Sequence, residues 1–357
     1  MNFNNSHNAS MPIAFGEEMY AFLNDIIEEK NYSKIFILVD ENTSEHCLPV
    51  FLSELTTETP FEIIEIEAGE QHKNIETCAG VWETLTALLA DRKSLLINLG
   101  GGVVTDLGGF VASTFKRGID FIHVPTTLLG MVDAAIGGKN GIDLGVLKNQ
   151  IGMFQLPKAL LIDDRFLTTL PKNQMRSGLA EMLKHGLIQD AQYWEQLVRL
   201  QDLREENLLS LIQTSVKIKN EIVLKDPFEK NIRKALNFGH TIGHAIESYF
   251  LALNPEHPVL HGEAIAAGMI IESFLSYKNQ LIDFSVYSNI KMNIDQYFDK
   301  LPLNRENIEA IIPYLLHDKK NINQQIKFVL LQELGNFIID QNCNDAQIRE
   351  GFNNYIN

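Results

Sequence analysis

The sequence predicts an α/β protein in which an amino-terminal half built on a parallel sheet is followed by a mainly helical half. Up to about residue 165, short apolar runs of strand type alternate with stretches of helical periodicity, a pattern typical of a parallel sheet covered on both faces. Beyond that point long helical periods dominate. A length of 357 residues suits two domains. We therefore predict one domain over residues 1–165 and a second over 166–357.

The elements of the first half follow from their apolar patterns. Strands are expected where a short β-branched or alternating run ends at a polar residue or proline; these runs are 34–39, 61–66, 94–99 and 121–124. A helix is expected over 75–90, where Trp82, Leu85 and Leu88 recur at helical spacing. The third strand leads directly into three glycines and then into an expected helix that reaches Thr114.

Helical periods account for most of the second half. The predicted helices are 174–188, 193–204, 207–224, 240–251, 262–275, 283–299 and 305–317. A single strand is expected near the carboxyl end, at 326–331.

Composition and charge exclude several classes of function. The chain has 45% hydrophobic and 21% charged residues, which excludes a disordered or collagen-like protein. Its 30 Lys and Arg against 46 Asp and Glu give a net charge of -16, which argues against nucleic acid or an anionic membrane as a partner. No apolar run is long enough to span a bilayer, and residues 1–10 do not have the pattern of a signal peptide. Cys47, Cys78 and Cys343 are odd in number and far apart, so we expect reduced thiols and a cytoplasmic location.

A glycine-rich segment, Leu99–Gly109, joins a buried strand to a helix. Glycine lets the backbone approach a phosphate, and the helix amino terminus offers unpaired N–H groups. Nucleotide binding and a plain tight turn are both consistent with this segment. It differs from the common dinucleotide fingerprint, in which an acidic residue follows the glycines by about 20 positions; here the candidate acid, Asp40, precedes them. The polar turn Gly69–Lys73 by itself is more typical of a solvated loop.

Four histidines, at positions 240, 244, 257 and 261, fall close together in the second half. His240 and His244 are four residues apart, so on a helix they share a face and can bind a divalent metal that needs one further ligand. Glu181 is the best distant carboxylate, and Glu247 and Glu263 compete with it. The alternatives are two polar core histidines, and for Glu181 an ordinary ion pair with Lys184 on a solvated helix face.

Several cations lie beside turns, and each of them alone is best explained as a solvated residue. They are Lys116, Arg117, Lys139, Lys148, Lys319 and Lys320. Together they can bind a phosphorylated substrate, because Lys and Arg are the usual phosphate ligands in proteins.

Taken in order, these motifs resemble those of the 3-dehydroquinate synthase family, within the sugar phosphate cyclase superfamily. The resemblance spans nearly the whole chain. The matching segments are Gly69–Lys73, Gly100–Asp106, Lys116–Gly118, Pro125–Leu129, Val132–Asp133, Gly137–Lys139, Lys148–Asn149, Leu179–Lys184, Leu236–His244, His261–Glu263 and Asp318–Lys320.

The resemblance implies an amino-terminal α/β domain that binds NAD and a helical metal-binding domain related to glycerol dehydrogenase. It places the metal ligands on Glu181, His240 and His261, with zinc expected and cobalt as the alternative, and moves His244 to the region of the substrate's phosphate. The residues it assigns to NAD are Asp40, Asn42, Gly69, Glu70, Lys73, Gly101, Gly102, Val103, Val104, Thr105, Asp106, Thr126, Thr127, Lys139, Lys148, Phe166, Leu167, Thr168 and Thr169.

The resemblance also implies a substrate, a reaction and an assembly. Substrate contacts fall on Asp133, Lys139, Asn149, Lys184, Lys219, Arg233, Asn237, His244, Lys319 and Lys320. Arg117 would reach the active site of a neighbouring subunit, so a homodimer is expected. The implied reaction converts 3-deoxy-D-arabino-heptulosonate 7-phosphate, a small phosphorylated sugar acid, to 3-dehydroquinate and phosphate in the shikimate pathway of aromatic amino acid biosynthesis. It combines transient oxidation by NAD, β-elimination of phosphate, re-reduction, ring opening and an aldol closure.

Three positions depart from the family pattern: the stretch Gly141–Lys148, Asn140 where threonine is frequent, and Asn231 where glycine is usual. Three other functions remain in competition with the synthase. These are a related cyclase that makes a valiolone or 2-deoxy-scyllo-inosose, a metal-dependent polyol dehydrogenase with net redox turnover, and a catalytically silent NAD-binding or scaffold protein. The substrate residues that are retained favour the synthase, and the presence of all three metal ligands argues against a silent scaffold.

Overall fold

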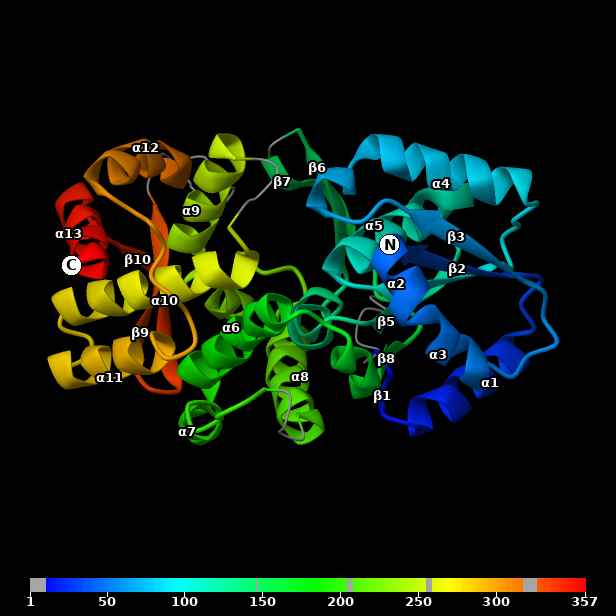
Figure 1. Cartoon of the computed structure of the whole chain (residues 1–357), viewed down its shortest axis with the longest axis horizontal. Coiled ribbons are helices and arrows are strands. Elements are labelled where there is room, and N and C mark those ends of the chain that lie inside the picture. The colour runs from blue at the N-terminus through cyan, green and yellow to red at the C-terminus, as the bar shows by residue number, and fades with distance from the viewer. Residues whose placement is uncertain (1–10, 146, 204–207, 255–258, 317–325) are drawn as a thin grey trace, which may run out of the picture. The chain divides into compact units, whose positions relative to one another are not determined.

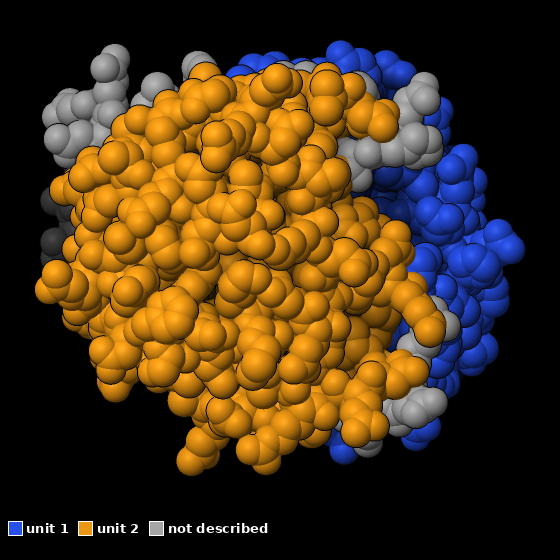
Figure 2. All heavy atoms as spheres, turned by 60° about the vertical axis from the view of Figure 1, so that its left-hand side comes forward, with its two compact units in different colours: residues 1–171 blue, residues 172–357 orange. Residues whose placement is uncertain are grey.

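The computed structural model describes the chain except residues 1–10, 146, 204–207, 255–258 and 317–325. It divides into two compact units, residues 1–171 and residues 172–357 (Figure 2). The sequence pattern changes at about residue 165, shortly before this division. Each unit is described by itself.

The first unit is built on a six-stranded sheet in the order β1-β8-β5-β4-β2-β3, and every pairing in it is parallel (Figure 1). This confirms the predicted parallel-sheet α/β class. The strands are β1 (Ile13–Phe15), β2 (Ile35–Asp40), β3 (Phe61–Ile66), β4 (Leu95–Gly100), β5 (Asp120–Pro125) and β8 (Leu160–Ile162). The four predicted strands are present within one residue at each end, whereas β1 and β8 were not predicted.

Helices pack against this sheet because alternate strand residues point to opposite faces. On one face Phe36 and Leu96 of the strands join Leu85 and Leu107 of the helices in a single buried core. The helices are α1 (Glu18–Lys30), α2 (Glu41–His46), α3 (Leu48–Glu54), α4 (Ile75–Ala87) and α5 (Gly102–Thr114). Helix α4 ends three residues before the predicted limit, because Leu89 takes a left-handed backbone with φ of 63°.

A separate antiparallel hairpin, β6 (Lys139–Leu144) and β7 (Leu147–Phe154), belongs to the first unit. It includes the two departures from the family pattern in this region. The buried amide of Asn140 donates to the carbonyl oxygens of Gly138 at 3.3 Å and Gln155 at 2.8 Å. Asparagine is therefore accommodated here by hydrogen bonds to the hairpin's own backbone.

The second unit consists mainly of helices, as predicted. They are α6 (Lys172–Gln189), α7 (Ala191–Leu197), α8 (Leu209–Lys225), α9 (His240–Leu253), α10 (His261–Lys278), α11 (Phe284–Ile294), α12 (Arg305–Leu316) and α13 (Asp345–Ile356). Helix α10 is central, because it packs against α6, α9, α11 and α13 and is buried without interruption from Ala264 to Ser276. A helix that is apolar on all sides is expected at the centre of such a unit.

Some boundaries in the second unit differ from the prediction. Helix α7 ends at Leu197 and α11 ends at Ile294, both earlier than their periodicity indicated. The predicted strand is present as β9 (Lys327–Glu333), and it pairs with an unpredicted β10 (Asn336–Asn342). Over the part of the chain that is described, no helix combines the length and apolar character required to cross a membrane.

Helices α9 and α10 pass unusually close to one another at three glycines. Gly239 precedes α9 with φ of 78°, and a Cβ on Gly268 would lie 1.9 Å from the Gly239 carbonyl oxygen. A Cβ on Gly243 would lie 3.1 Å from the Ala264 carbonyl oxygen. Both obstacles are backbone atoms, so they cannot rotate away. This close approach sets the spacing between the first turns of the two helices.

We predict that Gly268→Ala destabilises the chain by about 1–3 kcal/mol, because the added methyl group overpacks the crossing. Gly80→Ala is the matched control, since Gly80 also lies inside a helix but its Cβ would meet nothing within 4 Å. The control should gain about 0.5–1 kcal/mol from helix propensity. Urea unfolding curves of the three proteins would measure both effects. Equal stability of the two variants would contradict the close crossing.

Candidate metal and nucleotide sites

Three side chains from three helices of the second unit converge on one point. Glu181 lies inside α6, and His240 and His261 are the first residues of α9 and α10. The Nε2 atoms of His240 and His261 lie 3.4 Å and 3.5 Å from the Glu181 Oε1 atom. One ligand atom from each residue can be chosen so that all three lie within 4.8 Å of one another. This is the geometry expected of ligands around a single cation.

The Glu181 carboxylate is fully buried, and the interpretation of Glu181 and Lys184 as a solvated surface pair is wrong. Its Oε2 atom forms an ion pair with the equally buried Lys184. Its Oε1 atom, within the described part of the chain, has no hydrogen-bond donor. Burial by itself would raise the pKa of Glu181, but Lys184 and the two histidines outweigh burial and hold this pKa well below its usual range. The carboxylate is therefore charged and has one oxygen left for a cation.

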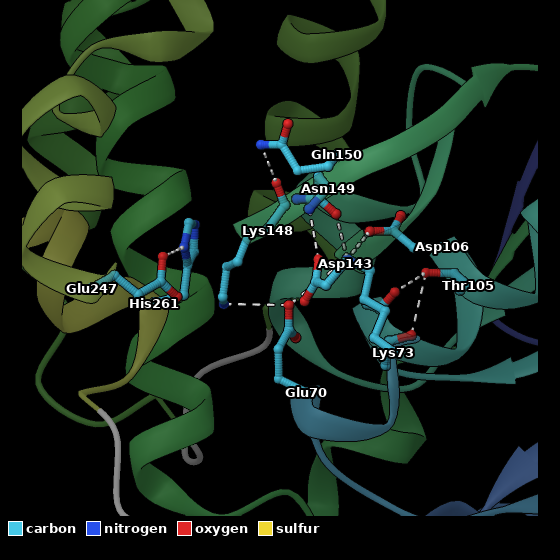
Figure 3. Close-up of polar contacts among 12 residues, drawn as sticks. Glu70, Lys73, Thr105, Asp106, Asp143, Lys148, Asn149, Gln150, Glu247 and His261 are labelled. Atoms are coloured by element: carbon cyan, nitrogen blue, oxygen red, sulfur yellow. Dashed lines mark hydrogen bonds and ion pairs between the residues drawn. The ribbon is translucent and has the colours of Figure 1, made fainter. Parts of the chain in front are cut away.

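The other ring nitrogen of each histidine has its own acceptor. His240 Nδ1 lies 3.1 Å from the carbonyl oxygen of Phe238. His261 Nδ1 lies 3.4 Å from Glu247 Oε2, as Figure 3 shows. A proton on Nδ1 satisfies each acceptor and leaves the Nε2 lone pair directed toward Glu181. Metal-binding histidines are held in this way by outer-shell acceptors.

The electrostatics of the cluster favour a positive charge at its centre. Burial would lower the pKa of His261, but Glu247 and Glu181 raise it to about 10. The pKa of His240 is lowered well below its usual range by burial and by nearby Lys184. Without a metal, His261 is therefore protonated on both ring nitrogens and His240 is neutral. A cation at the centre of the cluster would replace the Nε2 proton of His261 and free its lone pair. Carboxylate and neutral imidazole are a donor set that suits zinc and related divalent ions, so these residues fit a divalent metal.

Of the two histidines paired by their four-residue spacing, only His240 belongs to the group centred on Glu181. His244 lies beside His240, with ring centroids 5.1 Å apart, but it is not a member of that group. Glu247 faces His261 from its Nδ1 side, and Glu263 accepts from the backbone N–H of Leu260 as a cap of its own helix. His257 lies outside the described residues.

The predicted substrate residues of the second unit are mostly buried cations and their partners. Lys184, Lys219 and Arg233 are all nearly inaccessible. Arg233 donates through Nη1 to the Pro227 carbonyl oxygen at 2.6 Å, and Asn237 donates to Glu229 at 2.6 Å. Lys319 and Lys320 lie outside the described residues.

Asn231 occupies a position where the family usually has glycine. Its φ of -136° does not lie in the left-handed region that favours glycine. Its backbone N–H donates to Asp226 at 2.6 Å.

The first unit has its own candidate site at the carboxyl ends of β2 and β4. The chain runs outward from β2 to β3 and then returns to β4 on the other side of β2, which makes this a topological switch point. Open parallel sheets bind ligands at such points. Asp40 ends β2 and accepts two hydrogen bonds from Thr43, both through Oδ1. Asn42 follows it as an exposed residue of α2.

The glycine-rich segment places a helix amino terminus beside that switch point. Helix α5 begins at Gly102, directly after β4, with no side-chain cap and no acidic residue in its first turn. A Cβ on Gly101 would lie 3.0 Å from Thr127, so the loop also packs closely against a second predicted cofactor residue. An uncapped helix start of this kind attracts a phosphate. Of the other residues predicted here, Val103, Val104, Thr105 and Asp106 lie in the first turns of α5, and Thr126 follows β5.

A polar network surrounds Lys73 in the first unit (Figure 3). The ammonium of this buried lysine lies 2.7 Å from both Asp106 Oδ2 and Asn149 Oδ1, and 3.8 Å from Glu70. Glu70 also lies 3.3 Å from Lys148. Burial would lower the pKa of Lys73, but the acidic neighbours outweigh burial and raise it. The network joins residues that are far apart in the sequence and that were all predicted to contact cofactor or substrate.

The remaining predicted residues occupy separate places in the first unit. Asp133 is half-buried in a π-helical turn, Gly130–Ala134, and Lys139 is the exposed first residue of β6. Phe166–Thr168 lie in a short 3-10 helix that Thr169 ends, and Gly69 precedes another with φ of 114°. Arg117 has a left-handed φ of 71° and lines an open hollow of about 640 Å³ with Lys116 and Arg92.

Two residues that contact the candidate sites in the described structure were missed or misjudged from the sequence. Asp143 accepts from the backbone N–H of Asn149 at 2.6 Å and so holds Asn149 in its left-handed conformation next to Lys73. Nothing in the local sequence indicates this contact. Glu247 was treated only as a rival ligand, although its spacing of seven residues from His240 already placed it on the same helix face.

The fold and the two sites together define a class of proteins. Solved structures with the same fold include 2-deoxy-scyllo-inosose synthase complexed with carbaglucose-6-phosphate, NAD+ and Co2+, with a TM-score of 0.79 and 25% identity over 95% of both chains. They also include a 2-epi-5-epi-valiolone synthase of Streptomyces hygroscopicus with NAD+ and Zn2+ bound, with a TM-score of 0.82 and 23% identity over 100% of this chain and 99% of that one. The glycerol dehydrogenase of Schizosaccharomyces pombe is more distant, with a TM-score of 0.62 and 16% identity over 97% of this chain and 88% of that one. The fold is thus that of sugar phosphate cyclases and glycerol-type dehydrogenases.

Sequence comparison narrows this class to one family. The family model for the 3-dehydroquinate synthase N-terminal region matches residues 63–177, and the model for the C-terminal region matches residues 178–321. The 3-dehydroquinate synthase of Parabacteroides distasonis is 41% identical over 95% of this chain and 96% of its own length. That of Nitratiruptor sp. is 42% identical over 80% of this chain and 81% of its own. The chain belongs to the 3-dehydroquinate synthase family.

We predict strong coupling between Lys73 and Asp106 in a double-mutant cycle. Lys73→Met should cost about 3 kcal/mol or more, because it leaves a partly buried carboxylate without its cation. Adding Asp106→Asn should recover part of that loss, which gives a coupling energy of about 1–3 kcal/mol. Arg199→Met is the control, since Arg199 pairs with Glu195 on an exposed helix face and should cost about 0.5 kcal/mol or less. Denaturant unfolding of the wild type, the two single variants, the double variant and the control measures all five stabilities, and independent effects at Lys73 and Asp106 would refute the network.

Proposed function

We propose that this chain is a 3-dehydroquinate synthase, which converts 3-deoxy-D-arabino-heptulosonate 7-phosphate to 3-dehydroquinate and phosphate. The observation that carries the proposal is the Glu181, His240 and His261 cluster in a chain whose two halves match the two halves of that family. Three relatives with this name are 36% to 41% identical over 91% to 95% of this chain. The enzyme is then a carbon-oxygen lyase of aromatic amino acid biosynthesis. Its proposed location is the cytoplasm, where the three unpaired cysteines would stay reduced.

The proposed cofactors are NAD, held by the first unit, and one divalent metal, held by the second. Solved relatives contain NAD+ with Co2+ or Zn2+, so zinc is proposed and cobalt is the alternative. When bound, NAD accepts and returns a hydride, and the metal polarises a substrate hydroxyl. Asp40 and the start of α5 suit the ribose and pyrophosphate of NAD, because they lie at the switch point of the sheet.

The residues of the second unit prepare the site for an anionic substrate. Glu247 keeps the proton of His261 on Nδ1, which leaves Nε2 available as a ligand. Lys184 neutralises part of the charge of Glu181 and keeps that carboxylate ionised. Lys219 and Arg233 add buried positive charge for phosphate and carboxylate groups. The buried charges of Glu181, Lys184, Lys219 and Arg233 are set before the substrate arrives, and this is the preorganisation that the reaction requires.

In the first unit, Lys73 holds Asn149 by its side chain and Asp143 holds the same residue by its backbone. Asn149 and Lys148 are thereby kept in one conformation, and we propose that they bind substrate and cofactor, together with Asp133 and Lys139.

We also propose that the enzyme is a homodimer in which Arg117, on its exposed and left-handed turn, reaches the partner's active site.

The assay that tests the proposal supplies the heptulosonate phosphate with NAD and zinc, and follows phosphate release and NADH absorbance together. We predict stoichiometric phosphate with no net NADH, because the hydride returns within each turnover. Accumulating NADH would indicate a polyol dehydrogenase instead. Phosphate release from glucose 6-phosphate or sedoheptulose 7-phosphate, but not from the heptulosonate, would indicate another cyclase.

We predict that His261→Ala loses the metal and the activity together. Removing one of three ligands should lower phosphate release at least about 100-fold, because the metal supplies several kcal/mol of charge stabilisation. His46→Ala is the control, since His46 is an exposed residue of α2. Metal per chain is measured by atomic emission after dialysis. A His261→Ala enzyme with full metal content and full activity would refute the ligand assignment.

A further inference from the structure

A buried acidic residue on α10, Glu272, contacts the first turn of the neighbouring helix α9. Its side chain is fully inaccessible. Its Oε2 atom accepts from the backbone N–H of Gly239 at 2.7 Å, and its Oε1 atom accepts from that of Ile242 at 3.1 Å. Burying a carboxylate is costly unless donors compensate it, so these contacts indicate a specific role.

The two N–H groups are those that a helix normally satisfies with its own residues. In a capping box, the N-cap side chain accepts from the third helical N–H, and the third side chain accepts from the N-cap N–H. Helix α9 can form neither bond, because its N-cap is Gly239 and its third residue is Ile242. Glu272 replaces both with one carboxylate supplied by α10. Its negative charge also lies at the positive end of the α9 dipole, where an anion is stabilising.

His240 is the first residue of α9, and it lies between Gly239 and Ile242, whose backbone N–H groups Glu272 caps. The other histidine of the cluster, His261, is the first residue of the helix that carries Glu272. Eleven residues separate His261 from Glu272, and eleven steps of an α-helix return to within about 20° of the same direction. Both side chains therefore lie on the stripe of α10 that faces α9, with Gly268 between them to allow the close approach.

We propose that Glu272 is a positioning residue for the metal centre, because it ties the backbone at His240 to the helix that provides His261. This inference rests on the proposed metal site. Glu272 acts in this role through its two hydrogen bonds to the backbone of the first turn of α9. Without the cap, that turn can fray, and the His240 Nε2 atom then loses its fixed distance from Glu181 and His261.

The test is Glu272→Gln, which keeps the shape of the side chain but turns one acceptor into a donor that faces an N–H. The probe is cobalt(II) alone, titrated into metal-free protein against a competing chelator and followed by its visible absorption. We expect the dissociation constant to rise about 10–100-fold, as is typical when outer-shell support of a ligand is lost. The absorption bands should also broaden or shift, since the His240 geometry is no longer unique.

The matched control is Ser276→Ala, one turn further along α10. Ser276 is equally buried, donates to the Glu272 carbonyl oxygen at 2.8 Å and accepts from the backbone N–H of Leu331 at 2.9 Å. It should lose stability without loss of cobalt affinity. Equal cobalt affinity and spectra for Glu272→Gln and wild type would overturn the inference and leave the proposed function intact. A wild-type chain that binds no cobalt would contradict the proposed metal site and this inference with it.

A second measurement applies if Glu272→Gln does not fold. Amide hydrogen exchange of the metal-free wild type should show Gly239 and Ile242 protected at least as strongly as the interior amides of α9, because both are capped. Exchange at the rate of an open helix end would overturn the inference.

Discussion

The constraint on which the second unit depends is the burial of the charged Glu181 carboxylate among helices. A buried carboxylate is stable only if donors or cations surround it, and here the surroundings come from three different elements. Lys184 stands one turn further along α6, whereas the two histidines come from the first residues of α9 and α10. The unit must therefore hold three helices at fixed positions around one oxygen atom, Oε1 of Glu181. The glycines at the crossing of α9 and α10 and the cap from Glu272 both serve that requirement.

In the first unit the buried charged group is a cation instead of a carboxylate. Lys73 is inaccessible to solvent, and the acidic residues around it keep it charged. Its partners come from α5 and from the hairpin β6–β7, so the charge of one lysine fixes the hairpin relative to the helix that follows the glycine loop. The overall net charge of -16 suggested a poor partner for anions. Two of the buried cations, Lys73 and Lys184, contact residues of the candidate sites, and it is local charge, not the total, that determines what can bind there.

The sequence predicted elements well where burial is continuous or periodic. Strand β4 is buried at every residue and α10 along nearly its whole length, so their apolar patterns were unambiguous. Strands β1 and β8 are three residues long and form through pairing with distant strands, which no local pattern reveals. The β6–β7 hairpin was not predicted for a similar reason. Its glycines and polar residues are held in place by contacts such as the hydrogen bonds from Asn140 to the carbonyl oxygens of Gly138 and Gln155. Helix α13 was missed although its capping box, Asn344 with Gln347, is a recognisable start signal.

The site was predictable only in part, for a physical reason. Helical spacing relates residues on one helix, so it paired His240 with His244, whereas a metal is bound by residues that meet in space from several helices. The order of motifs along the chain provided Glu181 and His261, which lie 59 residues before and 21 residues after His240. Glu272 did leave a local signal, because it is the single acidic residue in the apolar run from Ala264 to Leu275. An acid in such a run, eleven residues from a histidine, predicts a buried charge on the face that carries that histidine. The same pattern therefore indicates candidate outer-shell residues in the sequences of other helical metal-binding proteins.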